Sequence, residues 1–399
     1  MKESEQKEFK EIELSRGMIF LFATACGVSV ANLYYSQPLL DTISSSFKTT
    51  DASAGFVFSL ALAGYTAGLL FIVPLGDIVS KRKLVLSLLC VVTLLLASAA
   101  LSSNITTLGI VLFLLGAATV VPQVIVPLAV GLSVPAKRGA VVGYVMTGLL
   151  IGILLSRTLS GWVASLYGWR SVFWMASILS ALLAFSLAVF LPEGRSGSRL
   201  SYPALLKSLH AIFIEHSLLR SSCAFGAASF AAFGIFWTTF SFLAAGAPYY
   251  FKPGLIGSFG LLGIAGCFAA SITGRLVDRR GPLAWISVAL LLVAVSFIIM
   301  CVFVDKIIWL SVGIFILDLG VQMNQVSNQT RIYTLPPEIH SRVNTVYMTS
   351  YFLGGSIGSA LGTLAWAHFG WNGVCAAGLL AALLGLAVLI PHKTPTLKG

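Results

Sequence analysis

Charged residues are scarce in this sequence. Asp, Glu, Lys and Arg together make up 10% of the 399 residues, against roughly 25% in an ordinary soluble domain. Apolar residues, by contrast, make up 57% of the chain. The low charge excludes an ordinary soluble globular protein, and the high apolar content excludes a disordered chain. The composition therefore favours an integral membrane protein.

Motifs of metal ligands, catalytic pairs and nucleotide-binding loops are also missing. The six cysteines form no CxxC pair, and each lies in an apolar stretch, where Cys behaves as a small buried hydrophobe. The five histidines form no spaced metal pair, and there is no Walker motif to bind ATP. We therefore expect no disulfide, no metal, no cofactor and no enzymatic activity.

Long apolar stretches recur along the whole chain. A helix needs about 20 mostly apolar residues to cross a bilayer. Twelve stretches satisfy this length, and they lie at residues 17–40, 53–75, 84–103, 106–130, 140–163, 171–191, 219–243, 254–274, 283–303, 307–331, 343–367 and 371–391. The sequence therefore predicts twelve membrane-spanning helices.

One connection, from Pro192 to Ser217, is longer than the others and divides the spans into six and six. We expect an N-terminal six-helix bundle over residues 1–192, a cytoplasmic linker over 193–217 and a C-terminal six-helix bundle over 218–399. Apolar residues repeat at helical spacing within the linker, so it should contain a short amphipathic helix.

The basic residues are distributed unevenly between the two sides of the predicted bundle. Twenty of the 25 Lys and Arg residues lie in the termini and loops of one side. Because basic loops stay in the cytoplasm, both termini are predicted to be cytoplasmic, in the inner (plasma) membrane. The net charge of +11 reflects this topology and indicates no nucleic-acid partner.

The two halves of the sequence repeat each other at a nearly constant spacing. Asp77 follows the second span, and Asp278 follows the eighth span 201 positions later. Gln123 and Gly152 recur as Gln325 and Gly354, both 202 positions later. An offset of six spans keeps the orientation of the helices, so the halves are parallel repeats, which in transporters place a binding site near the middle of the membrane.

The loop Gly274-x-x-x-Asp278-Arg279-x-Gly281 resembles the signature loop of the major facilitator superfamily, and the loop at Asp77 resembles its copy in the first half. The segments Ala31–Leu40 and Asp318–Gly320 resemble bacterial twelve-span drug:proton antiporters and sugar exporters. The resemblance implies an all-α membrane protein of two parallel six-helix repeats. It also implies transport of a small molecule by alternating access, by a functional monomer.

The resemblance further implies a gate on the cytoplasmic side. The N-terminus of the eleventh span carries a partial positive charge that Asp77 can stabilise, and Asp278 can do the same for the fifth span. The predicted gating residues are Asp77, Lys81, Arg82, Gly274, Asp278, Arg279 and Gly281.

Asp318 is the only acidic residue deep within a predicted span. It lies eleven residues into its span, about 17 Å from the outer end at a rise of about 1.5 Å per residue. An unpaired charge at this depth costs several kcal/mol, so the acid should face a cavity, pair or bind a proton. We predict that Asp318 carries the coupling proton; the alternative is a structural acid paired with a neighbour.

Polar side chains cluster on the same span as Asp318. Gln322, Gln325 and Gln329 follow it at spacings of four, three and four, so all share one helix face. Amides are costly against lipid, so this face should line water or polar partners. With the other cavity-lining spans that the resemblance implies, the predicted substrate-binding residues are Asn32, Tyr35, Gln37, Gln123, Trp237, Thr238, Gln322, Gln325, Asn328 and Gln329.

Arg157 is the only basic residue deep within a span. Its long side chain could extend outward to the membrane surface. Alternatively, it could bind an anion or neutralise Asp318, if the two helices meet.

These features predict secondary active transport of a small molecule, in the form of proton-coupled efflux by antiport through Asp318. Two alternatives stay open. One is uptake of a small metabolite, either independent of protons or by symport. The other is a membrane receptor that binds a ligand without transporting it.

Overall fold

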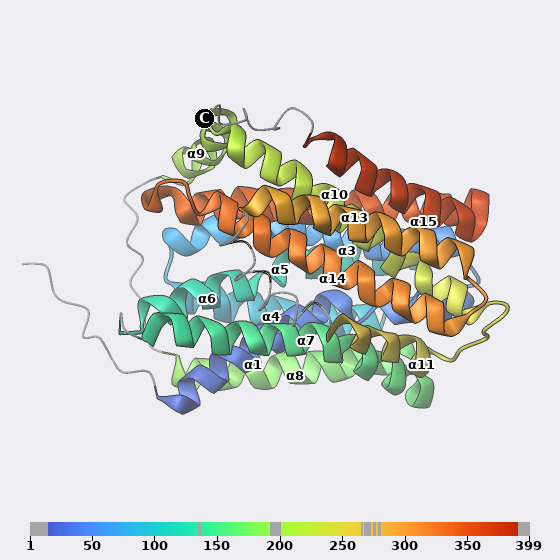
Figure 1. Cartoon of the computed structure of the whole chain (residues 1–399). Helices are drawn as coiled ribbons and strands as arrows, with labels where there is room; N and C mark the ends of the chain where they lie inside the picture. Colours follow the sequence, from blue (N-terminus) through green and yellow to red (C-terminus); the bar gives the residue numbers. More distant parts are fainter. Residues whose placement is uncertain are drawn as a thin grey trace, which may run out of the picture.

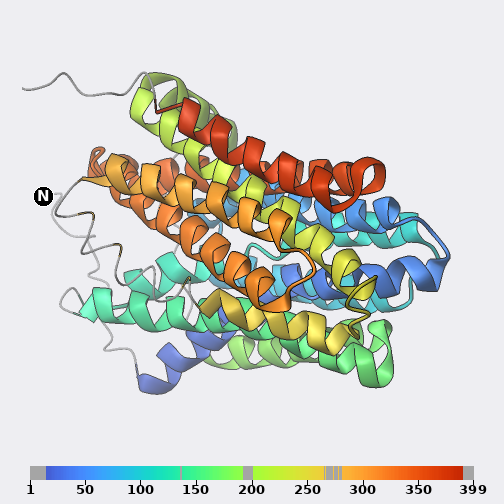
Figure 2. The same ribbon diagram turned by 45° about the vertical axis from the view of Figure 1, so that its right-hand side comes forward.

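The computed structural model describes residues 15–134, 137–191, 201–264, 266, 273, 277 and 281–389. In this part of the chain the regular structure is helical, and the long helices lie side by side (Figures 1 and 2). Ten helical segments within it are long and apolar enough to cross a membrane. One of them, Pro337–Ala387, contains two predicted spans, and the shorter apolar segment Pro253–Gly263 is the described part of another. The twelve predicted spans are therefore all represented.

The helices of the first half follow the predicted spans closely. They are α1 (Arg16–Tyr34), α2 (Leu40–Phe47), α3 (Asp51–Phe71), α4 (Lys81–Ala100), α5 (Ile105–Ala118), α6 (Val121–Gly131), α7 (Arg138–Tyr167) and α8 (Trp169–Phe190), with 3₁₀ helices η1 (Gln37–Leu39) and η2 (Val73–Asp77). The predicted span 106–130 corresponds to one membrane-length segment, Ile105–Gly131, but its helix is interrupted at Thr119 and Val120, between α5 and α6. Pro122 in the first turn of α6 has no backbone N–H, so the α5 hydrogen-bond pattern cannot continue through it.

The second half is built in the same way. Its helices are α9 (Tyr202–Glu215), α10 (Ser217–Ala245), α11 (Pro253–Ser258), the 3₁₀ helix η4 (Phe259–Gly263), α13 (Pro282–Val302), α14 (Ile307–Ile332) and α15 (His340–Ala387). Gly370 has non-helical backbone angles and kinks α15 between the two predicted spans. α9 buries Leu205, Leu209 and Ile212 on one side, as an amphipathic helix does.

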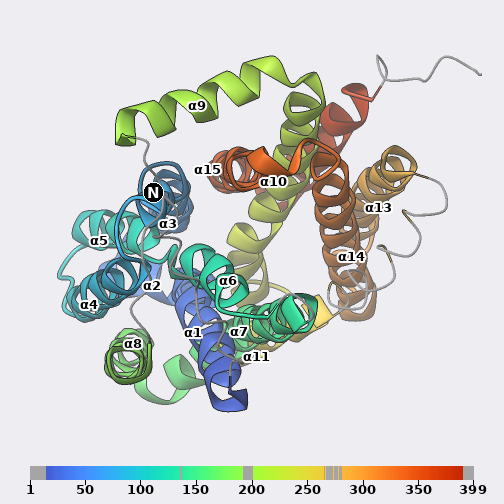
Figure 3. The same ribbon diagram turned by 90° about the vertical axis from the view of Figure 1, so that its left-hand side faces the viewer.

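Figure 3 looks along the helices and shows α1–α8 on one side, α10 and α13–α15 on the other, α11 beside α7, and α9 across one edge. In the first group α1 packs on α7 and α3 on α5, and in the second α10 packs on α15 and α13 on α14. The groups meet where α3 packs on α15 and α7 on α11. The expected linker over 193–217 stays a prediction, because residues 192–200 lie outside the described part of the chain.

Two ends of the bundle are distinguished below. The basic end carries Arg16, Lys81 and Lys137, and α9 lies there together with the start of α1 and the end of α15 (Figure 1). The far end carries Asp51 and Asp305.

The small residues of the fifth and eleventh spans pack helices within each half. At Gly152 on α7 there is no room for a Cβ against the backbone of Gly27 on α1. At Gly354 on α15, the equivalent of Gly152 in the second half, there is likewise no room against Ala227 on α10. These contacts hold each half together as a unit, and the two halves use the same device at equivalent places.

Candidate functional site

Asp318 lies in the middle of α14 and is 6% exposed. Its Oδ1 accepts a hydrogen bond of 3.2 Å from the Nε1–H of Trp237 on α10. Its Oδ2 is buried and has no hydrogen-bond partner among the described residues. One carboxylate oxygen is therefore held in place while the other is available to a proton or a donor.

Arg157 lies on α7 at a similar depth and is 2% exposed. Its Nε–H donates a hydrogen bond of 2.7 Å to Oε1 of Gln37. Gln37 begins the separate turn η1 after the end of α1, and Pro38, which has no backbone N–H, is the second residue of that turn. The alternative in which Arg157 extends to the membrane surface is wrong, because the side chain turns inward to Gln37.

Trp237 joins the two opposite charges. The guanidinium carbon of Arg157 lies 4.1 Å from the centroid of the indole ring, which is a cation–π contact. The N–H at the edge of the same ring donates the hydrogen bond to Asp318. Arg157 also attracts Asp318 electrostatically. Since Arg157 belongs to the first half and Asp318 to the second, the interaction crosses between the halves. We call Gln37, Arg157, Trp237 and Asp318 the central site.

The turn η4 forms one wall of the central site through two glycines. A Cβ at Gly260 would lie 2.9 Å from Cβ of Arg157, and one at Gly263 would lie 3.0 Å from Oδ2 of Asp318. A side chain at either position would therefore displace a charged group. Neither glycine was predicted as a site residue, although both lie on one predicted span at a spacing of three.

Several predicted substrate-binding residues lie outside the central site. Asn32 donates to Ser180, which links α1 to α8 at 3.4 Å. Thr238 shares a 2.7 Å hydrogen bond with Ser359 of α15. Tyr35 lines a groove between α1 and α7. These side chains connect helices or face a lateral surface, so the structure does not bring them to Asp318.

The polar face of α14 divides in the same way. Gln322 lies one helical turn after Asp318 on α14 and packs against Gly266. A Cβ added at Gly266 would lie 3.4 Å from Cβ of Gln322. Gln325 is 3.5 Å from the hydroxyl of Tyr351, which donates to it. The remaining two predicted residues are Asn328, which donates to Asn324 within α14 at 2.6 Å, and the half-buried Gln329. Only Gln322 is a direct neighbour of the central site.

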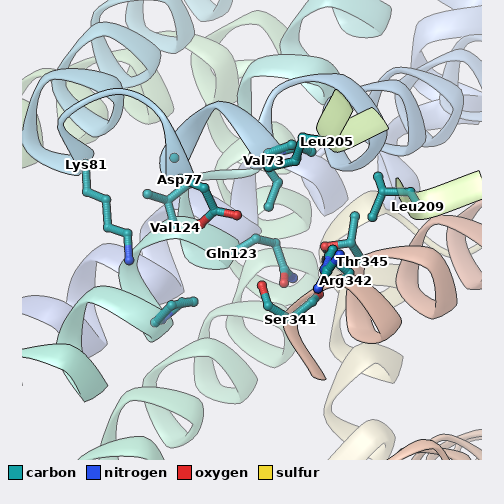
Figure 4. A pocket seen from close by; sticks show the side chains of 13 residues that line it. Val73, Asp77, Lys81, Gln123, Val124, Leu205, Leu209, Ser341, Arg342 and Thr345 are labelled. Carbon is teal, nitrogen blue, oxygen red and sulfur yellow. Dashed lines mark hydrogen bonds between the residues drawn. The ribbon is translucent and has the colours of Figure 1, made fainter. Parts of the chain in front are cut away.

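A small cavity of about 50 Å³ lies at the basic end (Figure 4). Asp77, Lys81 and Gln123 reach it from the first half, and Arg342 reaches it from the first turn of α15. Lys81 and Arg342 both attract the half-buried Asp77. The apolar residues of α9 cover one side of the cavity. The structure thus places Asp77 beside the N-terminus of the eleventh predicted span.

The other predicted gating residues are only partly described. Arg82 donates a hydrogen bond of 2.6 Å to the carbonyl oxygen of Ala188 on α8. Gly281 has a positive φ of 76° and precedes α13. Gly274, Asp278 and Arg279 lie outside the described residues.

Comparison with known proteins gives the family. The model of the Major Facilitator Superfamily matches residues 19–359, so the chain belongs to this superfamily of membrane transporters. The chain is 44% identical over 381 residues to the "Uncharacterized transporter YgaY" of Escherichia coli O157:H7, covering 94% of this chain and 95% of that one. It is 24% identical over 414 residues to the "Probable sugar efflux transporter" of Helicobacter acinonychis (strain Sheeba), covering 98% of each.

A solved structure shows the same fold. A crystal structure of a POT family transporter in complex with a thioalcohol-conjugated peptide superposes with a TM-score of 0.77 at 13% identity, covering 95% of this chain and 97% of that one. The protein is therefore a multi-pass membrane transporter of the major facilitator fold, and transporters of this kind move small molecules.

Proposed function

We propose that this transporter exports a small molecule in exchange for protons, and that Asp318 binds the proton. The observation that carries the proposal is the state of the Asp318 carboxylate. It is buried between the halves, Trp237 holds one oxygen, and the other has no partner within the described chain.

A proton on Oδ2 would remove the cost of an ionised carboxylate in the membrane interior. Arg157 compensates the ionised form instead, through its charge beside the same indole. Because these groups belong to different halves, gain or loss of the proton changes the attraction between the halves. This change is what couples proton binding to alternating access in the proposal.

Oδ2 also explains how proton and substrate would exclude each other. A substrate hydroxyl or ammonium group that donates to Oδ2 is displaced when that oxygen binds a proton. Competition for one atom is the condition that antiport requires. In this proposal the substrate lies against Gln37, Trp237 and Gln322, with the unpartnered Nη2 of Arg157 beside it.

The membrane orientation and the gate belong to the same proposal. The basic end faces the cytoplasm, with both termini, because basic loops are retained there. The bacterial relatives support an inner membrane location. Asp77 stabilises the N-terminus of α15 when the basic end is closed. The equivalent role that the resemblance implies for Asp278 stays a prediction, because that residue lies outside the described part of the chain. Separation of the two six-helix bundles moves Asp77 away from α15 and opens the site.

Export is the proposed direction because the sequence resembles the exporter branch and because one relative is named as an efflux transporter. A second candidate, uptake by proton symport, is favoured by one observation. Nη2 of Arg157 is buried and has no hydrogen-bond partner among the described residues, so it could bind an anionic substrate. That anion would weaken the electrostatic attraction between Arg157 and ionised Asp318. Because this favours the protonated carboxyl group, anion and proton would bind together.

Proteoliposomes with an imposed pH gradient test these candidates. Radiolabelled sugars, amino acids and amphipathic cations are offered to wild-type protein, to Asp318→Asn and to Asp305→Asn, a control at an exposed acid of the far end. Antiport predicts substrate movement against the proton flow, lost in Asp318→Asn and kept in the control. Movement with the proton flow supports symport. Substrate flux that does not depend on the pH gradient and is unchanged in Asp318→Asn contradicts proton coupling.

A further inference from the structure

A second, larger hollow lies away from the central site. It has a volume of about 1110 Å³ and runs along the seam of α1 and α7, with Leu179 of α8 at one edge. In Figure 3 these three helices lie together at the lower edge of the bundle. The seam groove, as we call it, is lateral, so in a membrane it opens toward lipid rather than toward the space between the halves.

The lining of the seam groove is mostly apolar and open. Phe20 is 74% exposed, and Tyr144 is 65% exposed. Ile151 and Leu155 continue the exposed apolar wall along α7. The close packing of α1 and α7 at Gly27 and Gly152 leaves a shallow floor between these walls. Such a surface is suited to a flexible hydrocarbon chain.

The basic end of the seam groove has the opposite character. Arg16 and Lys137 line it there, one from the start of α1 and the other from the residue before α7. Both are exposed. Basic residues beside an apolar groove at the membrane surface attract anionic lipid headgroups, at about 1 kcal/mol for each Lys or Arg.

The groove is also long enough for a lipid chain. From Arg16 to the C-cap residue Tyr35 it follows α1 over nineteen residue steps, or about 28 Å at about 1.5 Å per residue. This length is close to the whole hydrocarbon core, about 30 Å, so it exceeds the single leaflet that one lipid occupies. A phosphate at Arg16 and Lys137 would therefore leave room for a whole acyl chain below it.

We propose that the seam groove binds one anionic glycerophospholipid. Its phosphate lies between Arg16 and Lys137, and one acyl chain lies along α1 and α7. The lipid bridges the two helices that carry the close packing at Gly27 and Gly152. It thereby stabilises the half of the transporter that holds Arg157, without touching the central site. This site is independent of the proposed direction of transport.

Native mass spectrometry of the full-length protein tests the proposal, with phosphatidylglycerol and phosphatidylcholine that carry the same acyl chains. The wild type should retain phosphatidylglycerol about 25-fold more tightly, from about fivefold for each basic side chain. Arg16→Gln and Lys137→Gln should each lose about fivefold, and together the whole preference. Lys83→Gln, a matched exposed lysine at the start of α4, should keep it.

A groove-filling variant guards against a general charge effect. Ala140→Trp places a large side chain in the seam groove beside Lys137 and leaves both charges intact. It should lower the retention of both lipids. Three results would overturn the proposal: equal retention of the two lipids by the wild type, a preference that survives the loss of both basic residues, or unchanged retention of both lipids in Ala140→Trp. A different occupant would be indicated if an amphipathic cation bound to the groove, if Ala140→Trp blocked this binding, and if Arg16→Gln and Lys137→Gln left it unchanged.

Discussion

Replacing Arg157 by Gln tests how the central site is held together. Arg157 and Asp318 are 2% and 6% exposed, so the substitution leaves a buried carboxylate whose compensating charge is gone. Removing one partner of a buried ion pair costs about 3–5 kcal/mol, whereas replacing both partners costs far less. Arg157→Gln should therefore lower the free energy of unfolding by about 3–5 kcal/mol.

The second substitution makes this prediction specific. Asp318→Asn in the Arg157→Gln background removes the unpaired charge, so the double variant should regain about 1–3 kcal/mol relative to Arg157→Gln alone. The assay is the thermal midpoint of the purified protein in detergent, together with chemical denaturation for the energies. Arg170→Gln is the control, because Arg170 also stacks on an indole, that of Trp169 at 4.3 Å, but lies at the far end. Simple addition of the two losses at Arg157 and Asp318 would refute the reasoning.

Two further predictions concern the neighbours of Asp318. Trp237→Phe keeps a ring face for Arg157 but removes the 3.2 Å hydrogen bond to Asp318, so stability should fall by about 1.5–3 kcal/mol, as expected for a hydrogen bond to a charged group. An unchanged unfolding midpoint would contradict it. Gly263→Ala places a Cβ 3.0 Å from Oδ2 of Asp318 and should cost about 1–3 kcal/mol and impair proton-driven transport. Gly143→Ala, where no described atom lies within 4 Å of the added Cβ, should be harmless or stabilising, and equal losses in both variants would argue against the steric account.

The positions of the helices could be predicted from the sequence because hydrophobic length alone determines them. The spans at 140–163 and 307–331 correspond to α7 (Arg138–Tyr167) and α14 (Ile307–Ile332) within a few residues. The depth of Asp318 was likewise predictable, since it follows from position along a helix. The break between α5 and α6 was missed because Pro122 ends a hydrogen-bond pattern without changing the hydropathy.

The direction in which a side chain points was much less predictable. Gln37 accepts a hydrogen bond from Arg157, and Trp237 donates one to Asp318, as expected for site residues. Asn32 and Thr238 instead form hydrogen bonds with neighbouring helices. The rotation of each helix about its own axis depends on the residues of its neighbours, which a single span does not contain. Arg157 illustrates this, because it turns inward to Gln37, which lies in the separate turn η1 at the end of another helix.

The central claim is that Asp318 carries the proton that drives transport. The measurement that tests it most directly is proton movement on addition of a transported substrate, recorded with a pH-sensitive dye in proteoliposomes of wild type and Asp318→Asn. The account predicts that substrate moves protons in the opposite direction in the wild type, and that this movement vanishes in the variant while the protein remains folded. Substrate-dependent proton movement of equal size in Asp318→Asn would contradict it.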